Sequence, residues 1–219
     1  MADQFDRWAP TYDRCRLARW YQAQALAVLA HARLPGGGSV LDVGCGTGWA
    51  LRHLARARPD MTGIGVDISS GMIVAAQAAS HREGLANLRF RTLDWEDDDA
   101  ARPGLCDVVL CISAFHYFAD PLRALRRMRS ALRPGGQLLI LERATDNSLL
   151  TKVWDVAHRW VIRDHVGFHS SGKLQSWTQE AGFADAKLLA RHRRLFWKGK
   201  LYSSLLVMEA KAPVAELAQ

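Results

Sequence analysis

Residues 40–50, VLDVGCGTGWA, decide the fold class of this 219-residue chain. An apolar, strand-like run ends at Val43, and glycines follow at positions 44, 46 and 48 before a helical pattern begins. Because glycine has no side chain, such a loop lets the backbone approach a ligand at the carboxyl end of a strand. The dinucleotide-binding fingerprint needs its third glycine where this sequence has Trp49. The loop therefore indicates a nucleotide-type site and argues against a pyrophosphate cradle.

Around this loop the chain alternates strand-like runs with helical stripes. The strand-like runs are SVLDVG, TGIGVD, LRF, DVVLCI and QLLILE, and helical spacing covers residues 48–58, 69–82 and 121–132. Near-continuous apolar strands separated by helices predict a parallel sheet covered on both faces. Two further runs, about 184–191 and 201–209, are too closely joined for a parallel crossover and are expected to pair antiparallel. The predicted fold class is α/β.

The length suits one domain covering residues 1–219. Residues 14–33 have the apolar spacing of a packing helix and belong to an expected N-terminal cap, 1–33. Residues 143–170 contain a helical pattern beyond a minimal α/β unit, and we expect them to form a lid-like insertion after the fifth strand.

The formal net charge of +7 admits a nucleic-acid surface, a membrane-surface patch, an acidic substrate, or no more than good solubility. The arginines of residues 121–132 fall between apolar stripe positions, which is typical of a solvated helix face. The four cysteines show no disulfide or zinc spacing. With neither an apolar membrane-length run nor a secretory signal, the protein is expected to be cytoplasmic.

Asp67 is the second residue that indicates a ligand. It ends the run TGIGVD, near the spacing after a glycine loop at which a carboxylate meets ribose hydroxyls. A carboxylate only accepts hydrogen bonds, so it can bind two hydroxyl donors at once. The alternative is that Asp67 caps the helix beginning near Ser69. Its combination with the glycine loop favours the ligand.

The ordered motifs LDVGCGTG, VDIS, the Asp of RTLDWE, CDVVLCISAFHYF and LRPGGQLLILE resemble class I S-adenosylmethionine-dependent methyltransferases. The similarity is greatest to the small-molecule branch that includes ubiquinone- and menaquinone-type enzymes, and it covers roughly residues 5–142. This resemblance implies a Rossmann-like, doubly wound, seven-stranded sheet with its last strand antiparallel. It also implies S-adenosyl-L-methionine as the cofactor.

The resemblance assigns cofactor contacts by position. Asp42 and the glycine loop would hold the methionine end, Asp67 the ribose and Asp94 the adenine amino group. The backbone N–H of Trp95 would meet the adenine ring, and Tyr12 would close over the cofactor. The full set of expected cofactor contacts is Tyr12, Asp42, Gly44, Cys45, Gly46, Thr47, Gly48, Asp67, Ile68, Met72, Asp94, Trp95, Cys111 and Ile112.

The acceptor side offers one candidate catalytic group, His116, directly after the fourth strand. It could remove a proton or orient the acceptor, or it could be a histidine hydrogen-bonded in the wall. Expected substrate contacts are Tyr117, Glu142, His165 and His169, although Glu142 could equally cap a helix or pair a charge. Two histidines in one loop without a third ligand do not predict a metal site.

Three functions remain open from the sequence. The first is methyl transfer to an oxygen, nitrogen or carbon nucleophile of a small molecule, aromatic or apolar in character. The second is RNA or protein methylation, which the charge admits, but an N/D-P-P-Y-like tetrapeptide is missing where CISAF stands. The third is cofactor binding without catalysis. No DNA partner is expected, membrane-surface contact stays open, and the motifs specify neither the acceptor nor the oligomeric state.

Overall fold

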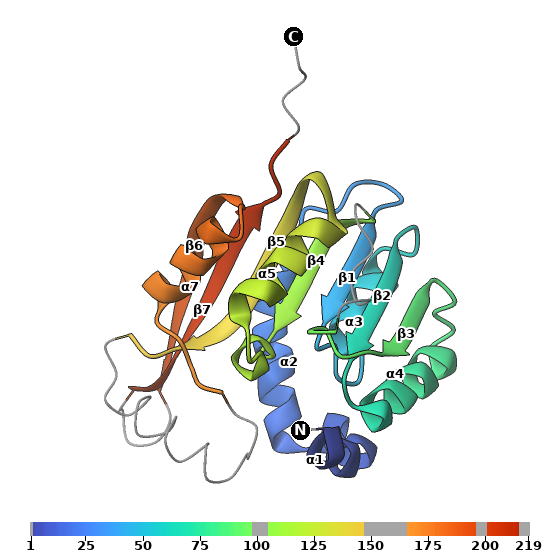
Figure 1. Ribbon diagram of the computed structural model, residues 1–219. Coiled ribbons are helices and arrows are strands. Elements are labelled where there is room, and N and C mark those ends of the chain that lie inside the picture. Colours follow the sequence, from blue (N-terminus) through green and yellow to red (C-terminus); the bar gives the residue numbers. More distant parts are fainter. Residues whose placement is uncertain (1, 98–104, 147–165, 196–200, 215–219) are drawn as a thin grey trace.

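The computed structural model describes residues 2–97, 105–146, 166–195 and 201–214. In these ranges the chain forms a seven-stranded sheet of order β3-β2-β1-β4-β5-β7-β6 (Figure 1). The strands are β1 Ser39–Val43, β2 Thr62–Asp67, β3 Leu88–Thr92, β4 Cys106–Ile112, β5 Leu132–Ala144, β6 Ala184–Leu195 and β7 Leu201–Lys211. Strands β1 to β5 pair in parallel, and β7 is antiparallel to both β5 and β6. The predicted α/β class and the antiparallel last strand are confirmed.

The helices of the described residues lie before β1 and in the connections β1–β2, β2–β3, β4–β5 and β5–β6. They are α1 Ala2–Trp8, α2 Arg16–Leu29, α3 Trp49–Ala57, α4 Ser70–Arg82, α5 Pro121–Ala131 and α7 Ser171–Glu180, with short 3-10 helices η1 Ala9–Arg14 and η2 Phe115–Tyr117. Among these residues no helix is long and apolar enough to cross a membrane.

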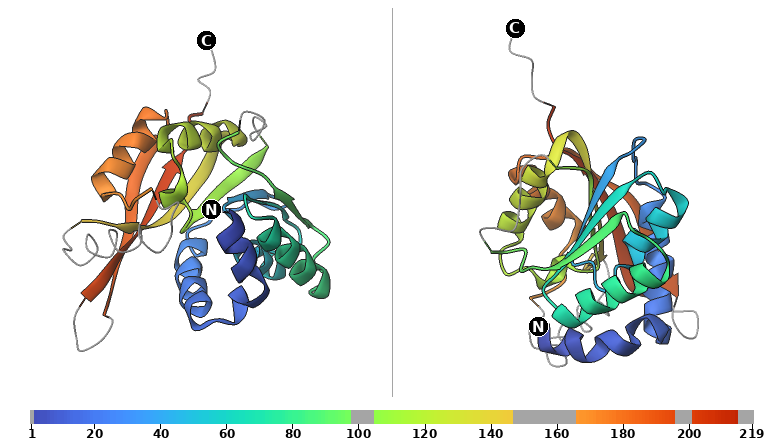
Figure 2. Two further views of the ribbon diagram at one scale, coloured as in Figure 1. Left: turned by 60° about the horizontal axis from the view of Figure 1, so that its bottom comes forward. Right: turned by 90° about the vertical axis from the view of Figure 1, so that its right-hand side faces the viewer.

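Successive side chains of a strand enter opposite faces of the sheet. The apolar strands therefore give the sheet an apolar layer on each face. On β4, Val109 and Cys111 pack with α5 and α7, whereas Val108 and Leu110 pack with α2, α3 and α4. Figures 1 and 2 show these two groups of helices on opposite faces. Burial of both layers leaves the carboxyl ends of the parallel strands as the place for a ligand.

The N-terminal cap contains more structure than the single helix expected from residues 14–33. The chain first forms α1 and η1, and Cys15 then adopts an extended backbone that separates η1 from α2. The Cys15 Sγ atom accepts a hydrogen bond from the Ala18 N–H at 3.3 Å and so caps α2. Both α1 and α2 lie at the end of the sheet toward which β1 and β2 point (Figure 1).

The start of β5 differs from the prediction, and the core of the predicted lid is not described by the structure. Strand β5 begins at Leu132, before the predicted run QLLILE, because Leu132 pairs with Cys106 ahead of a register shift. The core of the expected lid, residues 147–165, lies outside the described residues, so the lid stays a prediction.

Candidate functional site

A cavity of about 660 Å³ lies at the carboxyl ends of β1, β2 and β4, beneath the N-terminal helices. Its volume is in the range of small-molecule sites. The predicted residues that line it are Tyr12, Asp42, Gly44, Cys45, Gly46, Thr47, Asp67, Ile68, Met72, Asp94, Trp95, Ile112, His116, Tyr117 and Glu142. The fold therefore brings most of the candidate residues from both expected sets to one place.

The glycine loop needs glycine for conformation and for space. Gly44 and Gly46 have φ angles of 73° and 53°, in the left-handed region that side chains rarely adopt. A Cβ added at Gly44 would lie 2.4 Å from the Ala114 Cβ, whereas one at Gly46 would meet no protein atom within 4 Å. Gly48 packs against the Phe90 ring and does not line the cavity. The open space at Gly46 fits close approach by a ligand.

Asp67 shapes the loop while lining the cavity. Its Oδ2 accepts a hydrogen bond from the Gly46 N–H at 2.8 Å, and its Oδ1 accepts one from the Ser69 N–H at 2.9 Å. Burial raises the pKa of Asp67, and these two hydrogen bonds oppose that rise. Asp67 thus supports the start of α4 and also presents a carboxylate to the cavity.

Asp42 is a buried carboxylate with an unsatisfied oxygen. Only 2% of the residue is exposed, and its Oδ1 has no hydrogen-bond partner among the described residues. Burial, followed by the charge of Asp67, raises the pKa of Asp42 to about 7. An unpaired buried carboxylate is costly, so this position suits a cationic ligand group such as the ammonium of an amino acid.

The far side of the cavity is fixed by hydrogen bonds around Trp95. The Trp95 Nε1 donates to the Ala124 carbonyl at 3.2 Å, and the Arg127 Nη1 donates to the Trp95 carbonyl at 2.7 Å. Asp94 accepts at Oδ1 from the Glu96 N–H at 2.9 Å. The segment after β3 is therefore held against α5, with Asp94 and Trp95 both on the cavity wall.

Two N-terminal aspartates that sequence reasoning missed hold the cap over the cavity. Asp6 accepts at Oδ1 from the Ser69 Oγ at 2.6 Å and from the Gly71 N–H at 2.7 Å. Asp13 accepts at Oδ1 from the Thr47 Oγ1 at 2.6 Å. Both carboxylates thus join the cap to loops that follow β1 and β2.

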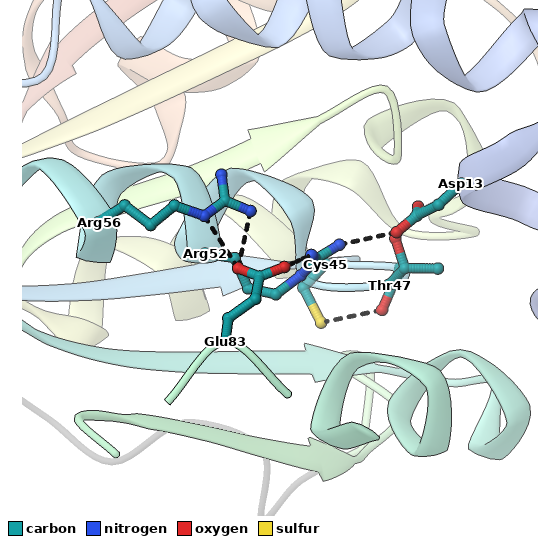
Figure 3. A network of polar contacts seen from close by, with 7 residues as sticks. Asp13, Cys45, Thr47, Arg52, Arg56 and Glu83 are labelled. Atoms are coloured by element: carbon teal, nitrogen blue, oxygen red, sulfur yellow. Dashed lines mark hydrogen bonds and ion pairs between the residues drawn. The ribbon is translucent and has the colours of Figure 1, made fainter. Parts of the chain in front are cut away.

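Arg52 adds an ion pair to the contact between Asp13 and the glycine loop (Figure 3). Its Nη2 lies 2.7 Å from the Asp13 Oδ2, and its Nη1 is paired with Glu83, although only 5% of Arg52 is exposed. Residues 48–58 also contain Arg56 and Arg58, which are exposed, so the sequence held no signal that singled out Arg52.

The remaining wall is aromatic and contains the His116 side chain. Phe5, Trp8, Tyr21 and Phe168 line this part of the cavity together with His116. The Nδ1 atom of His116 lies 2.9 Å from both carboxylate oxygens of Glu142, a residue that is 1% exposed. Burial raises the pKa of Tyr117, which also lies on this wall.

Besides Gly48, three predicted site residues do not line the cavity or lie outside the described residues. Cys111 is fully buried in the core and is not among the cavity-lining residues. His169 packs edge-on against Trp177, at 4.7 Å between ring centroids, and does not line the cavity either. His165 lies outside the described residues. The described residues hold no group of three side chains suited to a metal ion.

Comparisons with known proteins agree with this geometry. A family model described as "Methyltransferase domain" matches residues 8–188. Ubiquinone biosynthesis O-methyltransferase from Xanthomonas campestris is 35% identical over 113 residues, which make up 52% of this chain and 46% of that protein. The chain thus spans about half the length of this curated relative.

Solved structures share the fold. The YcgJ protein from Bacillus subtilis superposes with a TM-score of 0.74 at 17% identity, covering 87% of this chain and 98% of that one. The S-adenosylmethionine-dependent methyltransferase SibL, in its apo form, has a TM-score of 0.68 at 25% identity, covering 89% of this chain and 56% of SibL.

Proposed function

This chain belongs to the class I S-adenosylmethionine-dependent methyltransferases, and we propose that it methylates an oxygen, nitrogen or carbon nucleophile of a small molecule. Asp42 supports this proposal most directly, because its unsatisfied, buried carboxylate lines the same cavity as His116. A ligand ammonium at Asp42 would satisfy that oxygen and set the orientation of the whole cofactor.

Three carboxylates match three parts of the cofactor. Asp42 is on β1, Asp67 ends β2, and Asp94 follows β3, so they lie at the carboxyl ends of three adjacent strands. Two strand spacings amount to roughly 10 Å. In the order β1, β2, β3 these groups would hold the ammonium, the ribose hydroxyls and the adenine amino group of an elongated ligand.

S-adenosylmethionine, when bound, supplies a methyl group activated by a positively charged sulfur. The chain's own contribution is therefore mainly alignment, which is worth up to roughly 7–11 kcal/mol when reactants are held in near-attack geometry. The N-terminal cap would provide it by closing over both ligands, with Tyr12 and Phe5 on the cavity wall and Asp13 bonded to Thr47 of the glycine loop.

The acceptor is proposed to be a compact organic molecule. Phe5, Trp8, Tyr21, Tyr117 and Phe168 form an aromatic wall that suits an aromatic or apolar body. The O-methyltransferase relative supports an oxygen nucleophile among the three kinds, although half of that protein lies outside the match. Cytoplasmic location is proposed along with this small-molecule role.

The test combines cofactor binding with an acceptor screen. We expect calorimetry to detect binding of S-adenosylhomocysteine, and methyl transfer to appear with a small hydroxyl, amine or carbon acceptor. Salt-dependent retention and methylation of RNA, or methylation of protein alone, would contradict the small-molecule proposal. Binding without transfer to any acceptor class would favour a non-catalytic binder.

A matched pair of glycine variants shows whether binding uses this cavity. Gly46 and Gly84 both have positive φ angles, 53° and 68°, and a Cβ at either meets no protein atom within 4 Å. Only Gly46 lines the cavity. Both variants carry backbone strain, but only a leucine side chain at position 46 fills the cavity. Gly46→Leu should therefore abolish binding, whereas Gly84→Leu should retain it. Equal affinities in the two variants would refute this location.

A further inference from the structure

We propose that Glu142 is a positioning residue for methyl transfer, which holds His116 with its proton on Nδ1 and its lone pair on Nε2. His116 would then take the proton that a hydroxyl or amine acceptor releases. This inference rests on the proposed function, and it assigns Glu142 a role different from the substrate contact expected from the sequence.

The carboxylate of Glu142 is already committed to three donors. Besides Nδ1 of His116, its Oε2 accepts from the His116 backbone N–H at 3.1 Å, and its Oε1 accepts from the Arg143 N–H at 2.7 Å. With 1% of Glu142 exposed, a substrate would have to displace these contacts to bind it. The carboxylate instead fixes the position of the His116 backbone and ring together.

The backbone and the ring of His116 have further contacts. The His116 carbonyl accepts from the Val166 N–H at 3.2 Å. Its ring centroid lies 4.1 Å from that of Tyr117 and 5.0 Å from that of Phe168. The imidazole is therefore placed by packing and hydrogen bonds rather than by a single contact, as a preorganised group requires.

Glu142 determines the tautomer because an ionised carboxylate only accepts hydrogen bonds. Burial by itself would raise the pKa of Glu142, but His116 and the hydrogen bonds around the carboxylate hold it below its usual value. Each carboxylate oxygen also accepts a backbone N–H, from His116 or from Arg143, which favours the ionised form whatever the charge of the ring. A neutral imidazole that faces this carboxylate must carry its proton on Nδ1. Nε2 then has the lone pair of a base.

The pair lies near the methionine end of the proposed cofactor site. Asp42 is on β1 and Glu142 on β5, with β4 as the only strand between them. Both residues and His116 line the same cavity. Tyr117 is near Glu142 and also near Tyr12, Tyr21 and Arg143, all on the cavity wall. The buried thiol of Cys111 on β4 is near Glu142 as well.

Methyl transfer with His116 as the base conserves protons and electrons. The acceptor oxygen or nitrogen bonds to the methyl carbon as the carbon–sulfur bond breaks, and that bond's electron pair stays on sulfur. The acceptor's proton moves to Nε2 of His116. The imidazolium ion formed is stabilised by Glu142 at 2.9 Å, which keeps its own charge.

The first test reads the tautomer directly and needs no acceptor. Nitrogen-15 NMR of the imidazoles, with His116 assigned through His116→Gln, should find neutral His116 protonated on Nδ1. The opposite tautomer in the wild-type protein would overturn the proposal. Because this readout does not depend on turnover, it separates failure of the Glu142 role from failure of the proposed function.

The second test uses an accepted hydroxyl or amine acceptor and single-turnover rates from pH 5.5 to 9.5. Glu142→Gln should lower the rate by about 10²–10⁴-fold, as expected when a base is lost. His116→Ala should lower it similarly, and the double variant should lose no more than either single variant. If the rate losses of the two single variants multiply in the double variant, Glu142 does not act through His116. An unchanged pH profile of the rate in Glu142→Gln would contradict that role as well.

Glu209→Gln is the matched control for the loss of a buried carboxylate. Glu209 is 1% exposed on β7 and bonds with Gln137 and Lys187, away from the cavity lining. Its variant should be destabilised while keeping the wild-type rate per folded molecule. S-adenosylhomocysteine affinity should be unchanged in Glu142→Gln, and a parallel loss of affinity and rate would indicate general damage to the site instead.

Discussion

Replacing Asp42 with asparagine should stabilise the folded protein at alkaline pH while weakening cofactor binding. In the fold, the pKa of Asp42 rises from 3.8 to about 7 through burial and the charge of Asp67. A rise of this size corresponds to about 4 kcal/mol. The folded carboxyl holds its proton more tightly than the unfolded one, so the free energy of unfolding falls as pH increases from about 4 to about 7.

The variant lacks this pH-dependent loss because asparagine does not ionise. Its buried amide still leaves a polar group poorly paired, at a cost of about 1–3 kcal/mol. The net gain above pH 7 is therefore about 2 kcal/mol, or roughly 4–8 °C in Tm for a chain of this size. Near pH 4, where Asp42 is protonated in the wild-type fold, there is no such gain, and the variant should be less stable than the wild-type protein by the amide's cost of about 1–3 kcal/mol.

Cofactor affinity should change in the opposite direction. A ligand ammonium favours the ionised form of Asp42, so wild-type affinity for S-adenosylhomocysteine should fall about tenfold between pH 8 and pH 6. In Asp42→Asn the affinity should be lower and should lack the part of the pH dependence due to Asp42.

Thermal unfolding from pH 4 to 8.5 and calorimetry at pH 6 and pH 8 measure both effects. Asp107→Asn is the control of opposite sign, since hydrogen bonds from Ser39 and Arg133 outweigh burial and lower the pKa of Asp107. That carboxylate adds stability above its unfolded pKa, so its loss should lower Tm at pH 8. A Tm difference for Asp42→Asn that is independent of pH, or full cofactor affinity, would refute the reasoning.

Three further variants test the loop and the cap. Gly44→Ala places a Cβ 2.4 Å from a neighbouring Cβ at a φ of 73°, so it should lose about 2–5 kcal/mol in urea unfolding, and wild-type stability would contradict the tight turn. Asp67→Ala should weaken S-adenosylhomocysteine binding by about 1–3 kcal/mol in calorimetry, and unchanged affinity would remove Asp67 from the cofactor site. Asp13→Ala removes the bond to Thr47, so amide exchange in residues 9–14 should become about tenfold faster, and unchanged exchange would show that the cap is held elsewhere.

The sequence by itself determined the features that depend on neighbouring residues. The glycine loop is one turn of consecutive residues, and apolar runs with their helical intervals specify the parallel strands. Because parallel strands end at one edge of a sheet, their order was enough to gather Asp42, Asp67 and Asp94 at a single cavity. The same logic brought His116 and Glu142, which follow or end neighbouring strands, to that edge.

Tertiary structure alone decided the orientation of side chains and their partners across the chain. In a strand covered on both faces every position is apolar, so the pattern does not tell which face Cys111 enters, and the fold buries it in the core instead of on the cavity surface. The pairings of Asp13 with Arg52 and of His116 with Glu142 join residues 39 and 26 positions apart. Such contacts form only when packing brings separate elements together, because no local periodicity encodes them.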